Sequence, residues 1–157
     1  MPTARASRMI AAPVEDLWRV IADPHHLPRW WPRVTRVEDV ADGAFTQVMR
    51  TRKGRVVRAD FDVVEVDEAA HRLKWEQRIA GTPFATVLRS SLTELSLAPA
   101  PPAGTEVTIE LLQELGAGTR PGGAWALPVP GFRGRLVRRA AHATIDEALD
   151  GLERISG

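Results

Sequence analysis

The chain has 157 residues, of which 44% are hydrophobic and 26% charged, and its formal net charge is +1. This length suits one hydrophobic core, so a single domain is predicted over residues 1–157. The charge balance gives no electrostatic reason to bind nucleic acid, and the absence of cysteine excludes disulfides, thiol nucleophiles and thiolate metal sites. No apolar segment is long enough to cross a bilayer or resembles a leader, so the cytoplasm is the expected location.

The first predicted elements are a strand and two short helices. Ser7–Ala12 is the strand, and Pro13–Ala22 is a helix because proline suits the first helical position and acidic residues follow in the first turn. Asp23 and the proline after it repeat this start signal. A second, distorted helix is therefore expected to run toward Trp30 and Trp31.

From Val34 onward the hydrophobic period changes to two, which predicts six strands joined by short turns. Short connections between consecutive strands imply antiparallel pairing. The expected strands are Val34–Val40, Phe45–Arg52, Arg55–Val66, Arg72–Ile79, Phe84–Leu97 and Thr105–Leu115.

Gly116–Gly131 is the one long irregular segment, rich in glycine and proline. Such segments in compact domains are usually functional, so it is predicted to be a mobile gate with Trp125 as an apolar plug. Its first six residues superficially resemble a dinucleotide-binding fingerprint. We reject that interpretation because Pro121 replaces the third glycine and no strand–turn–helix unit surrounds it.

The last segment, Phe132–Gly157, is predicted to be one long amphipathic helix. A long helix after a meander of strands predicts a sheet curved around that helix, with a cavity between the two. The core-facing stripe is expected to comprise Phe132, Leu136, Val137, Ala140, Ala141, Thr144, Ile145, Ala148, Leu149, Leu152 and Ile155.

Several segments also carry a family resemblance: Ile10–Trp18, Asp23–Val34, Leu73–Trp75, Pro102–Thr108 and the C-terminal helix. Together they resemble the START/Bet v 1-like (SRPBCC) superfamily, and within it the bacterial polyketide cyclase/dehydrase and lipid-transport group. The resemblance covers essentially the whole chain. It implies an α+β helix-grip fold, in which a seven-stranded antiparallel sheet wraps around the long C-terminal helix, and an apolar cavity that binds a hydrophobic small molecule. It does not imply catalysis.

Strand alternation selects the side chains that should face this cavity. It places Trp75 on the concave face, together with polar residues that either bond to one another or line a partly wet pocket. A register error of one residue would reverse a face. Adjacent helical residues point apart, so at most one of Trp30 and Trp31 should line the pocket, and both can equally be structural aromatics. The candidate ligand-binding residues are Trp30, Trp31, Gln47, Trp75, Gln77, Ser90, Gln113 and Trp125.

The sequence predicts no catalytic residue, metal site or cofactor. Its four histidines, His25, His26, His71 and His142, are interpreted as solvated or structural rather than as catalytic bases. No spacing typical of metal ligands and no phosphate-binding loop is present.

Charge is unevenly distributed along the last helix, with arginines at its start and acidic residues at its end. A solvated face is the favoured interpretation. The alternative is a transient contact of these arginines and the apolar segment Trp125–Val129 with an anionic membrane surface or an acidic partner during ligand loading. The oligomeric state is expected to be a monomer or homodimer.

Three functions remain open. The preferred one is binding or transport of a hydrophobic or aromatic, lipid- or polyketide-like small molecule. A polyketide cyclase or aromatase would require an ionisable group that points into the cavity. A stress-related, chaperone-assisting interaction domain would be favoured if side chains filled the cavity.

Overall fold

The computed structural model describes residues 3–116 and 132–156. The gate predicted over Gly116–Gly131, its plug Trp125 and the membrane-contacting segment Trp125–Val129 therefore lie outside the described residues, apart from Gly116. The elements are β1 (Ala4–Ile10), α1 (Val14–Ile21), η1 (Pro24–His26), α2 (Leu27–Trp30), β2 (Val34–Ala41), β3 (Ala44–Arg50), β4 (Val56–Asp67), β5 (Arg72–Gln77), η2 (Pro83–Thr86), β6 (Leu88–Ala100), β7 (Gly104–Leu115) and α3 (Phe132–Ser156).

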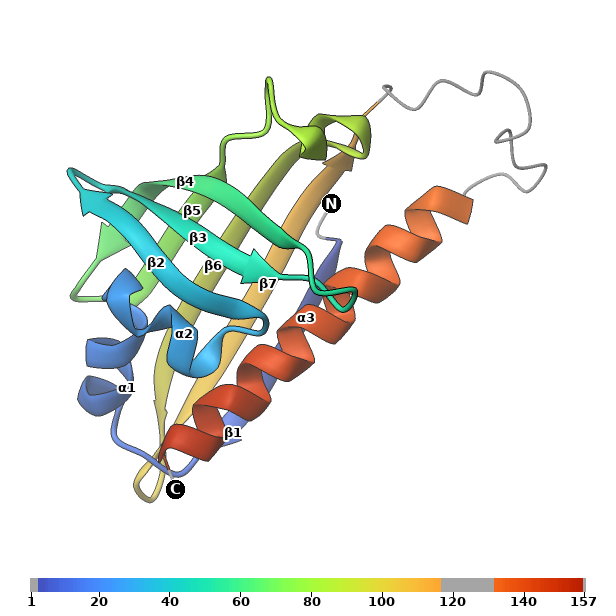
Figure 1. The fold of residues 1–157 in the computed structure, drawn as a ribbon. Helices are drawn as coiled ribbons and strands as arrows, with labels where there is room; N and C mark the ends of the chain where they lie inside the picture. The colour runs from blue at the N-terminus through green and yellow to red at the C-terminus, as the bar shows by residue number, and fades with distance from the viewer. Residues whose placement is uncertain (1–2, 117–131, 157) are drawn as a thin grey trace.

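The described residues form one seven-stranded sheet in the order β1-β7-β6-β5-β4-β3-β2. Every neighbouring pair is antiparallel. Figure 1 shows the sheet curving around α3, with α1 and α2 at the end where α3 terminates. The predicted helix-grip fold is confirmed. None of the described helices combines the length and apolar character needed to span a membrane.

Two strands, β1 and β6, differ most from the prediction. β1 covers Ala4–Ile10 instead of Ser7–Ala12, because it pairs with β7 over that whole length, from Ala4 opposite Leu111 to Ile10 opposite Thr105. The predicted strand Phe84–Leu97 begins instead with the short helix η2, where Pro83 fixes the backbone and supplies no N–H for a ladder.

The core lies between the sheet and the second half of α3. Ile145, Ala148 and Leu152 are completely buried there. Gly151 permits the closest approach in this region, because a Cβ added to it would lie 2.9 Å from the Trp30 Cα. The predicted stripe is therefore correct for this half. It is wrong at Leu136, which is 49% exposed, since the sheet does not cover that side of the first half.

Candidate ligand pocket

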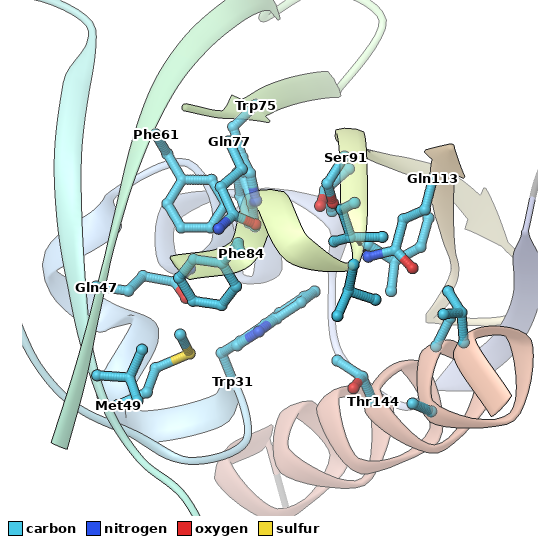
Figure 2. Close-up of a pocket in the computed structure, with 18 of the residues that line it drawn as sticks. Trp31, Gln47, Met49, Phe61, Trp75, Gln77, Phe84, Ser91, Gln113 and Thr144 are labelled. Carbon is cyan, nitrogen blue, oxygen red and sulfur yellow. Dashed lines mark hydrogen bonds between the residues drawn. The ribbon is translucent and has the colours of Figure 1, made fainter. Parts of the chain in front are cut away.

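A pocket of about 560 Å³ lies between the concave face of the sheet and the first half of α3. Strands β3 to β7 line one side, η2 and the start of β6 lie at one end, and α3 contributes Val137, Ala140, Ala141 and Thr144. Figure 2 shows Thr144 projecting from α3 toward the side chains of the sheet. The long helix thus serves as a wall of the pocket in one half and as core in the other.

An aromatic cluster lies on the β3–β5 side of the pocket, and its members Phe61, Trp75 and Trp31 line the pocket. The ring centroids of Phe45 and Phe61 lie 5.3 Å apart and nearly parallel, and Trp75 meets the Phe45 ring edge-on at 5.7 Å. Trp31 extends the cluster, with its centroid 5.6 Å from that of Trp75. Edge-to-face and offset contacts of this kind stabilise aromatic pairs beyond their buried area, so the wall is built of mutually braced rings.

Only one of the two adjacent tryptophans lines the pocket. The helix α2 ends at Trp30, and the backbone of Trp31 is already extended, so the two side chains leave the chain in different directions and their rings meet edge-on, with centroids 5.3 Å apart. Trp31 lies against the pocket, whereas Trp30 is 2% exposed and packs in the core. This agrees with the expectation that at most one would face the cavity.

Three glutamines bring amide groups into this apolar space. Gln113 donates from its Nε2 to the Ser91 hydroxyl at 3.2 Å. The Nε2 atoms of Gln47 and Gln77 are buried and have no hydrogen-bond partner. Both belong to the predicted set, and both line the pocket with Trp75 and Gln113.

Ser90, predicted to face the cavity, points to the outer side of the sheet. Its hydroxyl donates to the Glu114 carboxylate at 2.8 Å, and Ser91 lines the pocket in its place. The cause is a register shift between Leu88 and Ser90, since one inserted residue reverses the alternation beyond it. Alternation counted from Leu88 could not reveal this bulge. The last candidate, Trp125, lies outside the described residues.

Sequence reasoning also missed several residues that line the pocket. Val57 and Phe61 alternate along β4 with exposed residues, so the period-two pattern contained a signal for both. Phe84 gave no such signal, because it enters the pocket through η2 and not through a strand.

None of the described ionisable side chains lines the pocket. On the outer face of the sheet, hydrogen bonds with Glu94 and Glu65 raise the pKa of Lys74. The His71 ring bonds to Glu15 at 2.9 Å, and the His25 ring to Asp23 at 2.8 Å. Across residues 3–116 and 132–156, no group of three His, Cys, Asp or Glu residues is placed to hold a metal ion.

Comparison with known proteins agrees with this architecture. Residues 1–157 match the family described as "Polyketide cyclase / dehydrase and lipid transport". No functionally curated protein matches the chain significantly.

Among solved structures, a START superfamily protein from Mycobacterium smegmatis superposes with a TM-score of 0.73 at 17% identity, over 98% of this chain and 95% of that one. A protein from Thermus thermophilus gives 0.69 at 23% identity, over 96% and 94%. The di-domain ARO/CYC protein BexL of the BE-7585A biosynthetic pathway gives 0.74 at 20% identity, over 96% of this chain but 45% of BexL. At these identities the likeness concerns the fold.

Proposed function

Because the chain belongs to the polyketide cyclase/dehydrase and lipid-transport family, we propose that it binds a hydrophobic or aromatic small molecule between the sheet and α3. The observation that carries this proposal is the pocket itself. Its volume of about 560 Å³ falls within the usual range for small-molecule sites, roughly 300–1,000 Å³. Its surface combines aromatic rings and aliphatic side chains with a few neutral polar groups, the composition typical of such sites.

Two alternatives receive less support. A cyclase or aromatase is suggested by the family and by the fold shared with BexL. General acid–base catalysis needs a titratable group within hydrogen-bond reach of the substrate, and the described lining residues offer amides and hydroxyls instead. A chaperone-assisting interaction domain would be favoured by a cavity filled with side chains, whereas this cavity retains open volume.

Blocking the pocket tests the proposal. Thr144 projects from α3 into the pocket, while Ala143, its neighbour on the helix, is exposed. Nile red, an uncharged apolar dye, should bind the wild-type protein and quench its tryptophan fluorescence, because Trp31 and Trp75 line the pocket. Thr144→Phe should weaken dye binding about tenfold or more, and the matched control Ala143→Phe should leave it unchanged.

Far-UV circular dichroism of both variants establishes that the fold is retained. Equal dye affinity in Thr144→Phe and the wild type would place the dye elsewhere and contradict the proposal. If Thr144→Phe weakens dye binding as expected, mass spectrometry of small molecules extracted from the purified protein would identify the natural ligand.

A further inference from the structure

Gln47 and Gln77 line the pocket with buried amide nitrogens that lack a hydrogen-bond partner. Gln47 is 1% exposed, so water reaches almost none of its surface. Its Nε2 has no partner, and neither has the Nε2 of Gln77. A buried donor left unpaired costs roughly 1–3 kcal/mol, which is why nearly all such groups in native proteins are satisfied. Two of them in one pocket call for a common explanation.

The sheet register places both amides on the concave face, on either side of β4. Gln47 in β3 lies opposite Ala59, and Gln77 in β5 lies opposite Phe61, two residues further along β4. Both side chains line the pocket, as does Phe61 on the strand between them (Figure 2). Two N–H donors thus flank an aromatic surface on which a flat ligand can stack.

Gln113 provides the internal comparison. It lines the same pocket, yet its amide is already bonded to the Ser91 hydroxyl. Among these three glutamines, a buried amide nitrogen without any partner is therefore found only in the pair on β3 and β5.

The missing partner must be an acceptor, and the pocket favours an uncharged one. A carboxylate would accept these bonds, but burying it without a cation is costly. None of the described lysine, arginine or histidine side chains lines the pocket. A ketone or quinone carbonyl supplies acceptor lone pairs without a charge, and it can be part of a flat ring system.

We infer that Gln47 and Gln77 form a donor subsite that selects planar aromatic ligands carrying a neutral carbonyl over hydrocarbons and carboxylates of the same shape. This inference rests on the proposed function, because it names the chemistry of the ligand bound in that pocket.

Three compounds with one tricyclic frame test the inference: fluorene, 9-fluorenone and fluorene-9-carboxylate. Their dissociation constants are measured by quenching of tryptophan fluorescence. The wild-type protein should bind 9-fluorenone about tenfold more tightly than fluorene, since one or two neutral hydrogen bonds contribute that much. It should bind the carboxylate more weakly than the ketone.

The double variant Gln47→Met/Gln77→Met keeps the side-chain length but removes both donors. It should bind fluorene at least as tightly as the wild type and lose the preference for 9-fluorenone. Gln113→Met is the matched control within the pocket: it will alter the wall for both compounds alike, but it should keep the preference for the ketone because the Gln113 Nε2 already donates to Ser91. Retained fluorene binding also shows that the pocket of each variant is folded.

The outcomes separate the two proposals. If fluorene and 9-fluorenone bind the wild type equally, or if the double variant keeps the tenfold preference, the donor subsite is wrong while apolar binding stands. If the carboxylate binds most tightly, the selection for a neutral acceptor is wrong. If none of the three compounds binds, the proposed function fails, and this inference fails with it.

Discussion

The two halves of α3 differ in packing: the second half lies in the core, and the first half lines the pocket. In the second half, Ile145, Ala148 and Leu152 have no exposed surface, and the helix backbone lies directly against Trp30. In the first half, Val137 and Thr144 are only partly buried and face an open pocket. One continuous helix is thus packed to core density at one end and left under-packed at the other.

This difference separates stability from binding. Removing or adding atoms in a close-packed region lowers the free energy of unfolding, because the surrounding side chains cannot relax fully. A side chain in the pocket wall has no packed neighbours on one side. The same substitutions there should therefore change ligand affinity more than the free energy of unfolding. Substitutions in the two halves can therefore test this division.

Matched glycine substitutions should change stability in opposite directions. A methyl group at Gly151 would overlap the carbonyl oxygen of Trp30 and come within 2.9 Å of its Cα, and backbone atoms cannot rotate away. Gly151→Ala should therefore lower the free energy of unfolding by about 3 kcal/mol. Gly134, in the first half, would place its Cβ 3.8 Å from the Leu115 side chain, an ordinary contact.

Gly134→Ala should accordingly stabilise the protein by up to about 1 kcal/mol, the usual gain for alanine over glycine in a helix. Urea denaturation of the two variants measures both effects. A stable Gly151→Ala protein would show that α2 does not approach the helix as closely as described.

Truncation of aliphatic side chains should separate the halves in the same way. Leu152→Ala removes fully buried atoms and should cost about 2–5 kcal/mol. Val137→Ala acts at the pocket wall and should cost less than about 1 kcal/mol. The effects on dye affinity should be the reverse: titration should show an altered affinity for Val137→Ala and the wild-type affinity for Leu152→Ala. Equal losses of stability would contradict the division.

Removing an unsatisfied amide should make the empty protein more stable. Gln47→Met replaces a buried donor that lacks a partner and should raise the free energy of unfolding by about 1 kcal/mol. Gln113→Met should lower it, because the Ser91 hydroxyl would lose its bond to the amide. Thermal denaturation without ligand measures both variants. Destabilisation by Gln47→Met would mean that its amide is satisfied in the empty protein.

Periodicity was sufficient to predict the fold and part of the pocket wall. Alternation along β3, β5 and β7 correctly placed Gln47, Trp75 and Gln113 on one face, because regular strands transmit their phase from residue to residue. It failed for Ser90, where a register shift changes the phase. The sequence could not predict which amides are hydrogen-bonded, because a bond such as Gln113–Ser91 joins residues 22 positions apart in the chain.

Removing the charge of Asp23, at the end of the molecule where α3 is closely packed, should have the smallest effect on the free energy of unfolding. Asp23 begins η1, and its side chain is 47% exposed. Partial desolvation acts to raise its pKa, but hydrogen bonds from the His25 backbone N–H and ring outweigh it, so the pKa lies below its usual value of 3.8. A lowered pKa contributes stability that is present above about pH 4 and is lost as the pH falls through the folded-state value.

Asp23→Asn keeps an oxygen that can accept the His25 N–H bond but cannot be ionised. At pH 7 the wild type should exceed it in unfolding free energy by only a few tenths of a kcal/mol, because exposed charges are strongly screened. The difference should shrink as the pH falls below about 4 and should vanish once Asp23 is protonated in the folded state as well. Urea denaturation at several pH values measures this. The losses of stability expected for Gly151→Ala and Leu152→Ala, in contrast, should not depend on pH. A difference between Asp23→Asn and the wild type that persists at the lowest pH would show that hydrogen-bond geometry, and not the charge of Asp23, stabilises the start of η1.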